Sequence, residues 1–187
     1  IAGFGSNYHN LMNRGINMNI FVLDSDPHAI ARNYPDIHLR KMMVEYVQLL
    51  SNAWPEEQAI YKRTHYNHPC SKWVRQSRQN YEWLYSLVHS MGWEYFNRFS
   101  KRHLSSIKLR ELPYDNPHLP GIGLTPWPQV MPIDYKIATT ILDNNFMGIC
   151  RLTTANETDS IKAYRRYYAA KLRGFRQRGI CKKTRTI

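Results

Sequence analysis

One short segment carries several side chains that are capable of acid-base or nucleophilic chemistry. Its polar residues lie three or four positions apart and are His38, Lys41, Glu45, Gln48 and Asn52. An α-helix has about 3.6 residues per turn, so this spacing would align all of them in one stripe. A carboxylate, an amine and an imidazole in one stripe could serve as acid, base or nucleophile. The stripe is either a solvent-facing edge or the wall of a cleft, where burial and paired charges would shift the pKa of each group.

The segment that carries this stripe is predicted to be a mostly buried helix over residues 36–52. Its apolar residues cover more than half of the helix circumference and are Leu39, Met42, Met43, Tyr46, Val47, Leu49 and Leu50. A shorter helix over residues 27–33 should precede it, because Asp26 supplies an N-cap and Pro27 suits the first helical position. Tyr34-Pro35-Asp36 would stop that helix and begin the next one.

The middle of the chain predicts further helix and one long extended segment. A helix is expected over residues 69–91, capped by Asn67 and broken at Gly92, with more helix over residues 93–112. Residues 113–132 contain six prolines and two glycines, which exclude a regular helix and predict an extended segment packed over the core.

The two ends of the chain complete the predicted fold. Residues 1–17 are rich in Asn and Gly and are expected to form a flexible extension. A short helix or strand and a turn are expected over residues 137–158. A final helix should begin at Asp159 or Ser160, run to Leu172 and break at Gly174. The fold class is all-α, a compact single-domain helical bundle over residues 18–187 with a long proline-rich loop and a basic C-terminal helix.

Positive charge is concentrated at the end of the sequence. The formal net charge is +12, and residues 151–187 carry eleven Lys and Arg against two acidic residues, which is +9 of that total. A surface that serves solubility alone would mix the two signs. The distribution therefore favours a polyanionic partner, with nucleic acid first and an anionic membrane surface second. No apolar run approaches the length of a membrane span, so we expect a soluble protein.

The final helix interleaves tyrosines with this charge, in the run Tyr164-Arg165-Arg166-Tyr167-Tyr168-Ala169-Ala170-Lys171. Tyrosine rings could stack on unstacked bases while the cations contact phosphates. Alternatively, Tyr164, Tyr167, Tyr168 and Leu172 form the buried face of an amphipathic helix. Nucleic-acid contact is supported by the charge in either case.

The histidines and cysteines do not indicate a metal site. His65, His68 and Cys70 lie within six residues, but their spacing fits no established zinc pattern, so contacts with phosphate or within the loop are favoured. The three cysteines are widely spaced and include no C-x-x-C pair. Reduced thiols in an intracellular setting are expected, with neither a metal nor a cofactor.

Three patches of the sequence resemble the phage endonuclease V family. They are Asp36-Ile37-His38-Leu39 followed by Glu45, then Asn67-His68 with Trp73 and Asn80-Tyr81-Glu82-Trp83-Leu84, and finally the Tyr164 to Lys171 run. The start at Met18-Asn19-Ile20-Phe21-Val22-Leu23 is similar to that of small phage proteins of the same type. The family consists of small all-helical pyrimidine-dimer DNA glycosylases with lyase activity. In that family an Asp-x-His-Leu stretch precedes the catalytic glutamate by the same spacing that separates His38 from Glu45 here.

The sequence also departs from that family. The family's nucleophile is the free α-amino group of a small N-terminal residue, whereas a polar segment precedes Met18 here. The family's arginines on the glutamate helix are replaced by Val44 and Gln48. These departures bear on the lyase step and on specificity for pyrimidine dimers.

The resemblance implies an enzyme that flips a damaged or modified base out of double-stranded DNA and removes it. Glu45 would be the catalytic group, with His38 as a proton donor or phosphate contact and Lys41 as a substitute amine or as a structural partner of Glu45. The predicted nucleic-acid contacts are His65, His68, Arg75, Arg78, Arg165, Arg166, Tyr167, Tyr168, Lys171 and Arg173. The expected setting is a monomer in the cytoplasm of a phage-infected bacterium. Two alternatives remain open, namely a related enzyme that modifies DNA bases by group transfer and a non-catalytic basic nucleic-acid-binding module.

Overall fold

The computed structural model describes residues 18–137, 139–140, 152–153 and 157–179. The helices of this part are α2 (Pro27–Asn33), α3 (Asp36–Ser51), α4 (Pro69–Gln76), α5 (Arg78–Phe99), α6 (Leu104–Lys108) and α7 (Glu157–Gln177). Short 3₁₀ turns lie at Glu56–Gln58, Leu109–Glu111 and Ile133–Tyr135. Two-residue strands, β1 (Thr139–Thr140) and β2 (Leu152–Thr153), pair antiparallel. The prediction of an all-α fold is confirmed, and the predicted extension over residues 1–17 lies outside the described residues.

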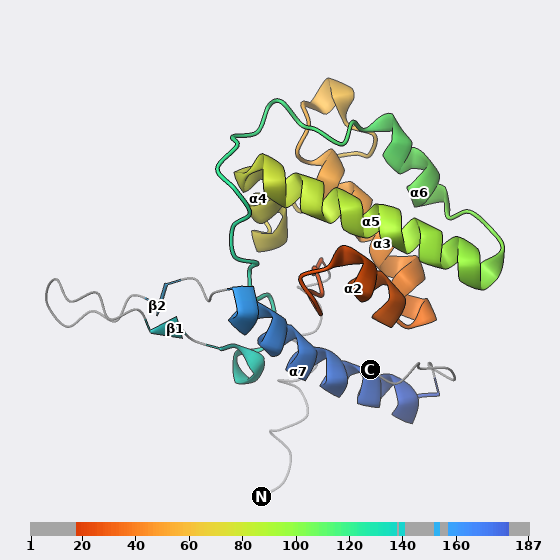
Figure 1. Ribbon diagram of the computed structural model, residues 1–187, viewed down its shortest axis with the longest axis vertical. Helices are drawn as coiled ribbons and strands as arrows, with labels where there is room; N and C mark the ends of the chain where they lie inside the picture. Colours follow the sequence, from red (N-terminus) through yellow and green to blue (C-terminus); the bar gives the residue numbers. More distant parts are fainter. Residues whose placement is uncertain (1–17, 138, 141–151, 154–156, 180–187) are drawn as a thin grey trace, which may run out of the picture.

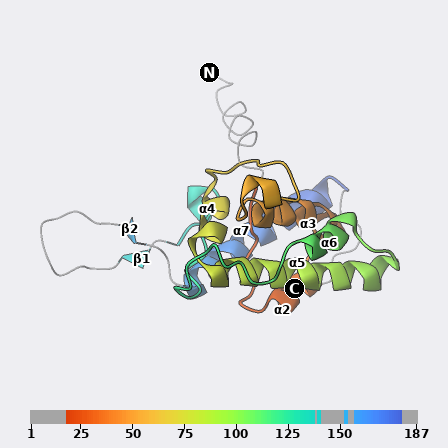
Figure 2. The same ribbon diagram turned by 90° about the horizontal axis from the view of Figure 1, so that it is seen from above.

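Helix α5 is the central element of the bundle. It packs against α2, α3, α4 and α6, and α3 also contacts α4 and α6 (Figures 1 and 2). Helix α3 has the apolar face that its sequence predicts, because Leu39, Met43 and Leu50 are fully buried. These contacts hold α3 rigidly, which matters because α3 carries the polar stripe.

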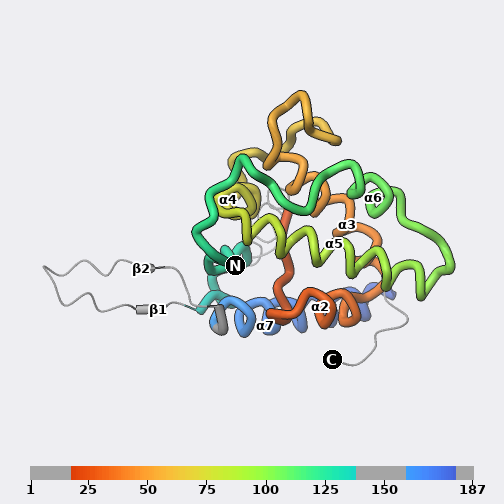
Figure 3. The backbone as a smooth tube through the Cα atoms, turned by 45° about the horizontal axis from the view of Figure 1, so that its top comes forward, coloured from red at the N-terminus to blue at the C-terminus, as the bar shows by residue number. Residues whose placement is uncertain are grey.

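An extended segment, residues 18–23, runs through the interior and links α3 to α7 (Figure 3). Two buried hydroxyls fix its backbone at Phe21. The Tyr34 hydroxyl donates to the Phe21 carbonyl at 2.8 Å, and the Phe21 amide donates to the Tyr46 hydroxyl at 3.1 Å. The two hydroxyls are 2.8 Å apart, so the Tyr46 hydroxyl is left to donate to that of Tyr34. Buried polar groups that are all satisfied in this way specify a single position for the segment.

Helix α7 packs against the other side of this segment. Its side chains Ala163, Tyr164, Tyr168 and Leu172 are buried. The Tyr164 hydroxyl donates to the side-chain oxygen of Asn19 at 2.8 Å, which joins α7 to residues 18–23. The prediction that these tyrosines form the buried face of an amphipathic helix is therefore confirmed for Tyr164 and Tyr168.

The proline-rich stretch contains no regular helix before the 3₁₀ turn at Ile133–Tyr135, as predicted, but bends and a turn interrupt it over residues 114–119. It crosses from α6 past α4 toward α7 (Figure 1). Trp127 of this stretch packs its ring 5.0 Å from that of Trp83 on α5. The Trp127 carbonyl accepts a hydrogen bond from Ser160 on α7 at 2.9 Å. The stretch therefore ties the last helix to the bundle.

Several predicted helix ends are wrong. The helix predicted over residues 69–91 is interrupted at Ser77, whose extended backbone ends α4 and whose side chain caps α5 by accepting from the Asn80 amide. Helix α5 passes through Gly92 and ends at Ser100, which adopts a left-handed conformation with φ of 52°. The cap of α4 is His68 and not Asn67.

The last helix is also longer than predicted. It begins at Glu157, before Asp159 and Ser160, and continues through Gly174 to Gln177. A glycine inside a helix costs about 1 kcal/mol relative to alanine, and the ring contact of Phe175 with His38 of α3 helps to hold the helix beyond Gly174. Within the described ranges, no helix is long and apolar enough to cross a membrane.

Candidate functional site

Glu45 is a buried carboxylate on α3, with 8% of its surface exposed. Its Oε1 lies 3.7 Å from Lys41 Nζ, one helical turn earlier. Its Oε2 is buried and has no hydrogen-bond partner among the described residues. Burial raises the pKa of Glu45 to about 7, against the opposing effects of Lys41, the Asn19 backbone amide and Lys171. A carboxylate with a free buried oxygen and a pKa near neutrality is suited to catalysis.

His38 lies two helical turns before Glu45 on the same face of α3, but it is not a surface group. It is 3% exposed, its ring stacks on Phe21 with centroids 5.1 Å apart, and its Nδ1 is 2.6 Å from the Tyr168 hydroxyl. Burial, followed by the charges of Lys171 and Lys41, lowers the pKa of His38 to about 3. The imidazole is therefore neutral near pH 7. This placement favours a positioning role for His38 over a phosphate contact.

Lys171 on α7 is the second amine near Glu45. Its Nζ lies 5.6 Å, 5.8 Å and 5.7 Å from the ring centroids of Phe21, Tyr167 and Phe175. Burial lowers the pKa of Lys171, and the charges of Lys41 and Arg178 lower it further, whereas Glu45 raises it. An amine whose pKa is lowered by burial loses its proton more readily than an exposed lysine, which makes it a better nucleophile at neutral pH.

The predicted stripe on α3 divides into two parts. Its first half contains Glu45, His38 and Lys41, whose amine side chain is 61% exposed. In its second half, Asn52 is buried and donates to the Thr64 carbonyl at 2.7 Å and to the Ser71 hydroxyl at 3.0 Å. Asn52 thus fixes the loop before α4. The site is built from the first half of the stripe together with residues 18–23 and α7.

We define the Glu45 cluster as His38, Lys41 and Glu45 of α3, Phe21 of the extended segment, and Tyr168 and Lys171 of α7. Sequence reasoning assigned Tyr168 and Lys171 to nucleic-acid contacts. The structure buries Tyr168 and places Lys171 close enough to Glu45 for the two charges to interact, without an ion pair between them. The spacing of Tyr168 and Lys171, three positions apart on one face of α7, was a signal that both side chains point inward.

The other predicted nucleic-acid contacts on α7 differ in whether their side chains are already paired within the protein. Arg165 donates to the Leu23 carbonyl at 2.6 Å and pairs with Asp24 at 3.0 Å. Arg166 and Arg173 are exposed, and no ion pair within the described residues includes either of them. Lys162, which sequence reasoning missed, lies one turn before Arg166 and is also exposed. Lys162, Arg166 and Arg173 form a basic stripe on the outer face of α7.

The predicted contacts before and at the start of α5 are mostly engaged within the protein. Arg75 donates to the Tyr66 carbonyl at 2.8 Å and covers the Tyr66 ring. Arg78 pairs with Asp115 at 3.2 Å. His68 caps α4, whereas His65 is exposed and bonds Thr64 at 2.7 Å. In the described part of the chain, no group of three His, Cys, Asp or Glu side chains could hold a metal ion.

Residues 18–106 match the model of a protein family described as pyrimidine dimer DNA glycosylase. The match begins at the extended segment and includes His38, Lys41 and Glu45. It ends before α7, so Tyr168 and Lys171 lie outside it. No curated protein and no solved structure matches the chain.

Proposed function

We propose that the chain removes a damaged pyrimidine from double-stranded DNA, with Glu45 as the catalytic carboxylate, because residues 18–106 match the model of the pyrimidine dimer DNA glycosylase family. The observation that carries the proposal is the buried Oε2 of Glu45, which has no hydrogen-bond partner among the described residues. A buried acceptor left unpaired costs free energy unless a substrate uses it.

The chemistry that suits Glu45 is stabilisation of positive charge on the sugar. When the bond between sugar and base breaks, the sugar acquires positive charge, and an ionised carboxylate in a poorly solvated site stabilises it strongly. The pKa of about 7 leaves roughly half of the Glu45 side chains ionised at neutral pH. The target nucleotide must first leave the base stack, which costs a few kcal/mol and is easiest for a damaged base pair.

An amine beside Glu45 would add a strand-cleaving step. An unprotonated amine can add to the C1′ aldehyde of the abasic sugar, and loss of water then gives an imine. Lys171 is better suited to this role than Lys41, because burial lowers its pKa while the Lys41 side chain is 61% exposed. His38 would hold α7 in place through Tyr168, so that Lys171 stays near the carboxylate.

The experiment compares base removal from irradiated and untreated duplex DNA. The full chain should produce abasic sites in irradiated DNA only. Glu45→Gln should reduce the single-turnover rate by about 100-fold or more, the scale of losing a main electrostatic group. Glu57→Gln, which changes an exposed carboxylate in the loop after α3, should leave the rate unchanged. If Glu45→Gln binds DNA and removes bases at the normal rate, the Glu45 cluster is not an active site.

The same experiment separates the rival functions. A base-modifying transferase would remove no bases and would therefore leave no abasic sites on any duplex. A non-catalytic module would bind DNA in a salt-dependent way and show neither activity.

A further inference from the structure

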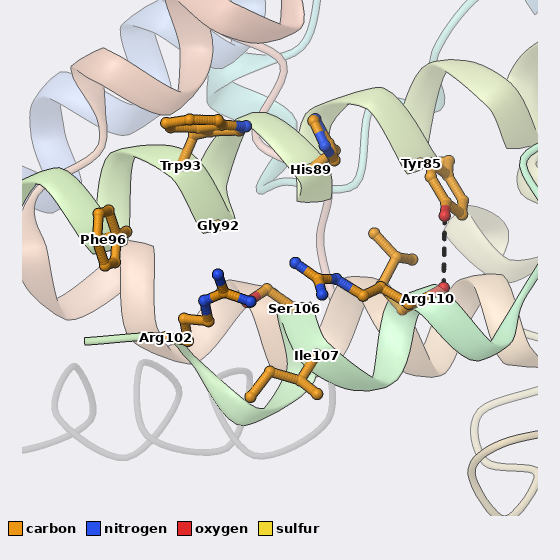
Figure 4. A pocket seen from close by; sticks show the side chains of 10 residues that line it. Tyr85, His89, Gly92, Trp93, Phe96, Arg102, Ser106, Ile107 and Arg110 are labelled. Carbon is orange, nitrogen blue, oxygen red and sulfur yellow. Dashed lines mark hydrogen bonds between the residues drawn. The ribbon is translucent and has the colours of Figure 1, made fainter. Parts of the chain in front are cut away.

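A hollow lies between α5 and α6, and none of its lining residues belongs to the Glu45 cluster (Figure 4). Its volume is about 190 Å³. Its lining residues on α5 are Tyr85, His89, Gly92, Trp93 and Phe96, and those on or beside α6 are Arg102, Ser106, Ile107, Leu109 and Arg110. We call this hollow the α5–α6 pocket.

The two helices approach most closely at Gly92. A Cβ atom added at Gly92 would lie 2.8 Å from the Ser106 Cβ, closer than two carbons can pack. The glycine therefore allows Ser106 to sit directly on α5. Both Gly92 and Ser106 also line the pocket, which lies beside this close contact.

Large aromatic side chains beside the pocket are left in water. Trp93 is 61% exposed and Phe96 is 45% exposed. They lie three positions apart on α5, and both line the pocket (Figure 4). Exposed aromatic rings beside a hollow are typical of surfaces that bind a flat ligand by stacking.

The charged side chains that line the pocket are both positive. Arg102 and Arg110 both extend into the space between the helices (Figure 4), and His89 adds a third nitrogen group. No carboxylate lines the pocket, and no ion pair of the described residues includes either arginine. Guanidinium groups bind phosphate through several parallel hydrogen bonds. The two exposed arginines are therefore available to bind an anion.

We propose that the α5–α6 pocket binds one unstacked nucleotide, with its base against Trp93 and Phe96 and its phosphate between Arg102 and Arg110. Stacking on aromatic rings and arginine contacts to phosphate together are how proteins hold single nucleotides out of a helix. Pockets for drug-sized ligands measure roughly 300–1,000 Å³. A hollow of about 190 Å³ takes one ring system, with the phosphate at its open rim.

The nucleotide could be free in solution or part of a single strand, since the recognised chemistry is the same. Isothermal titration of the full chain with deoxyadenosine monophosphate, deoxyadenosine, inorganic phosphate and a 5′-phosphorylated oligothymidine separates these sources. The monophosphate should bind at least about tenfold more tightly than either the nucleoside or phosphate, because it alone uses both halves of the pocket. Tighter binding of the oligonucleotide would identify a strand as the ligand, and equal binding a free nucleotide.

Variants of the lining residues test whether the measured nucleotide binding occurs at the α5–α6 pocket. Arg102→Gln with Arg110→Gln, and separately Trp93→Ala, should each weaken monophosphate binding by about tenfold or more. These side chains are exposed, so the variants should keep the helical circular dichroism of the parent. Lys72→Gln with Lys101→Gln removes the same charge from exposed positions outside the pocket and should leave binding unchanged.

The proposal is overturned if neither the monophosphate nor the oligonucleotide binds saturably at millimolar concentration, or if the pocket variants bind as the parent does. It stands apart from the proposed glycosylase function, because Glu45→Gln should not alter nucleotide binding at the pocket. A protein that binds the monophosphate but removes no bases would retain the pocket and lose the glycosylase.

Discussion

The Glu45 carboxylate makes the free energy of unfolding depend on pH. Its folded pKa, about 7, lies above the ordinary value of 4.5, so its contribution to stability is fully present below pH 4.5 and is lost as pH rises through 7. His38 has the opposite sign, since its folded pKa of about 3 lies below the ordinary 6.5. Its contribution is present above pH 6.5 and is lost as pH falls toward 3.

Glu45→Gln isolates the carboxylate, because His38 is common to both proteins. Near pH 4 we expect similar stability, since a protonated glutamate resembles glutamine. At pH 8.5 the variant should be more stable by on the order of 1–3 kcal/mol, given about 1.4 kcal/mol per pKa unit. Urea unfolding at both values measures this difference. A variant that is less stable than the parent at pH 8.5 would mean that the ionised carboxylate stabilises the fold.

The amine beside Glu45 can be identified by trapping. If Lys171 forms the imine, borohydride should link the protein covalently to irradiated DNA, and Lys171→Met should abolish the linked product while preserving the apolar contacts with the surrounding rings. Lys41→Met should retain it. Trapping in the Lys171→Met protein that vanishes in Lys41→Met would instead assign the imine to Lys41. Peptide mass spectrometry of the reduced complex locates the linked residue directly.

At this scale the sequence predicted half of the site. His38 and Glu45 are seven positions apart, and helical geometry alone places residues at that spacing on the same face of α3. Their shared face could therefore be predicted from the sequence. The arrival of Lys171 and Tyr168 depends on how α7 packs against Phe21, which no local pattern contains. The shifted pKa values of Glu45 and Lys171 have the same origin, because burial is a property of the assembled fold.

Among the elements, α2 was predicted correctly from local sequence rules, whereas the ends of α5 were not. The N-cap and proline pair at Asp26-Pro27 correctly predicted α2, because both signals act within one helical turn. Gly92 was predicted to break a helix on its low helix propensity. In the structure, its absent side chain allows α6 to approach α5. Ser77 was overlooked as a boundary, although its hydroxyl accepts from the Asn80 amide at 3.1 Å and donates to the Gly123 carbonyl at 2.6 Å.

Gly92→Ala tests which of these effects is larger. Helix propensity alone would stabilise the alanine variant by about 1 kcal/mol. The contact with Ser106 opposes this, since overpacking a close contact costs typically 1–3 kcal/mol. We expect net destabilisation of about 1 kcal/mol by urea unfolding. Adding Ser106→Gly removes the clash, so the double variant should lose less stability than the sum of the two single changes. Additive losses would show that α5 and α6 do not meet at Gly92.

Helix α7 joins the family-matched part of the chain to the rest. The matched residues 18–106 contain Glu45 but not the helix that covers it. Through Tyr164, Tyr168 and Lys171, α7 packs on residues 18–23, at the very start of the matched range. The site therefore depends on contact between the two ends of the described chain, and the proline-rich stretch that precedes α7 supports that contact through Trp127.

For the molecule as a whole, the formal net charge of +12 favours DNA over a neutral partner, but its position decides how DNA would lie. The basic stripe of Lys162, Arg166 and Arg173 is on the outer face of α7, whereas Lys171 faces inward to the Glu45 cluster. A duplex that contacts the stripe would run along α7. The outer cations would then supply affinity that does not depend on sequence, and the Glu45 cluster would act on the extruded base.

The salt dependence of DNA binding tests whether this stripe contacts phosphates. Each phosphate contact contributes about 0.9 to the slope of log affinity against log salt concentration. Changing Lys162, Arg166 and Arg173 to Gln should therefore lower the slope by up to about 2.7. Changing the exposed Lys62, Lys72 and Lys101 to Gln alters the net charge equally and should leave the slope nearly unchanged. Fluorescence anisotropy with duplex DNA between 50 and 300 mM salt, about the range over which such contacts weaken most, measures both. Equal losses in the two triple variants would mean that DNA senses the overall charge and that α7 does not set its path.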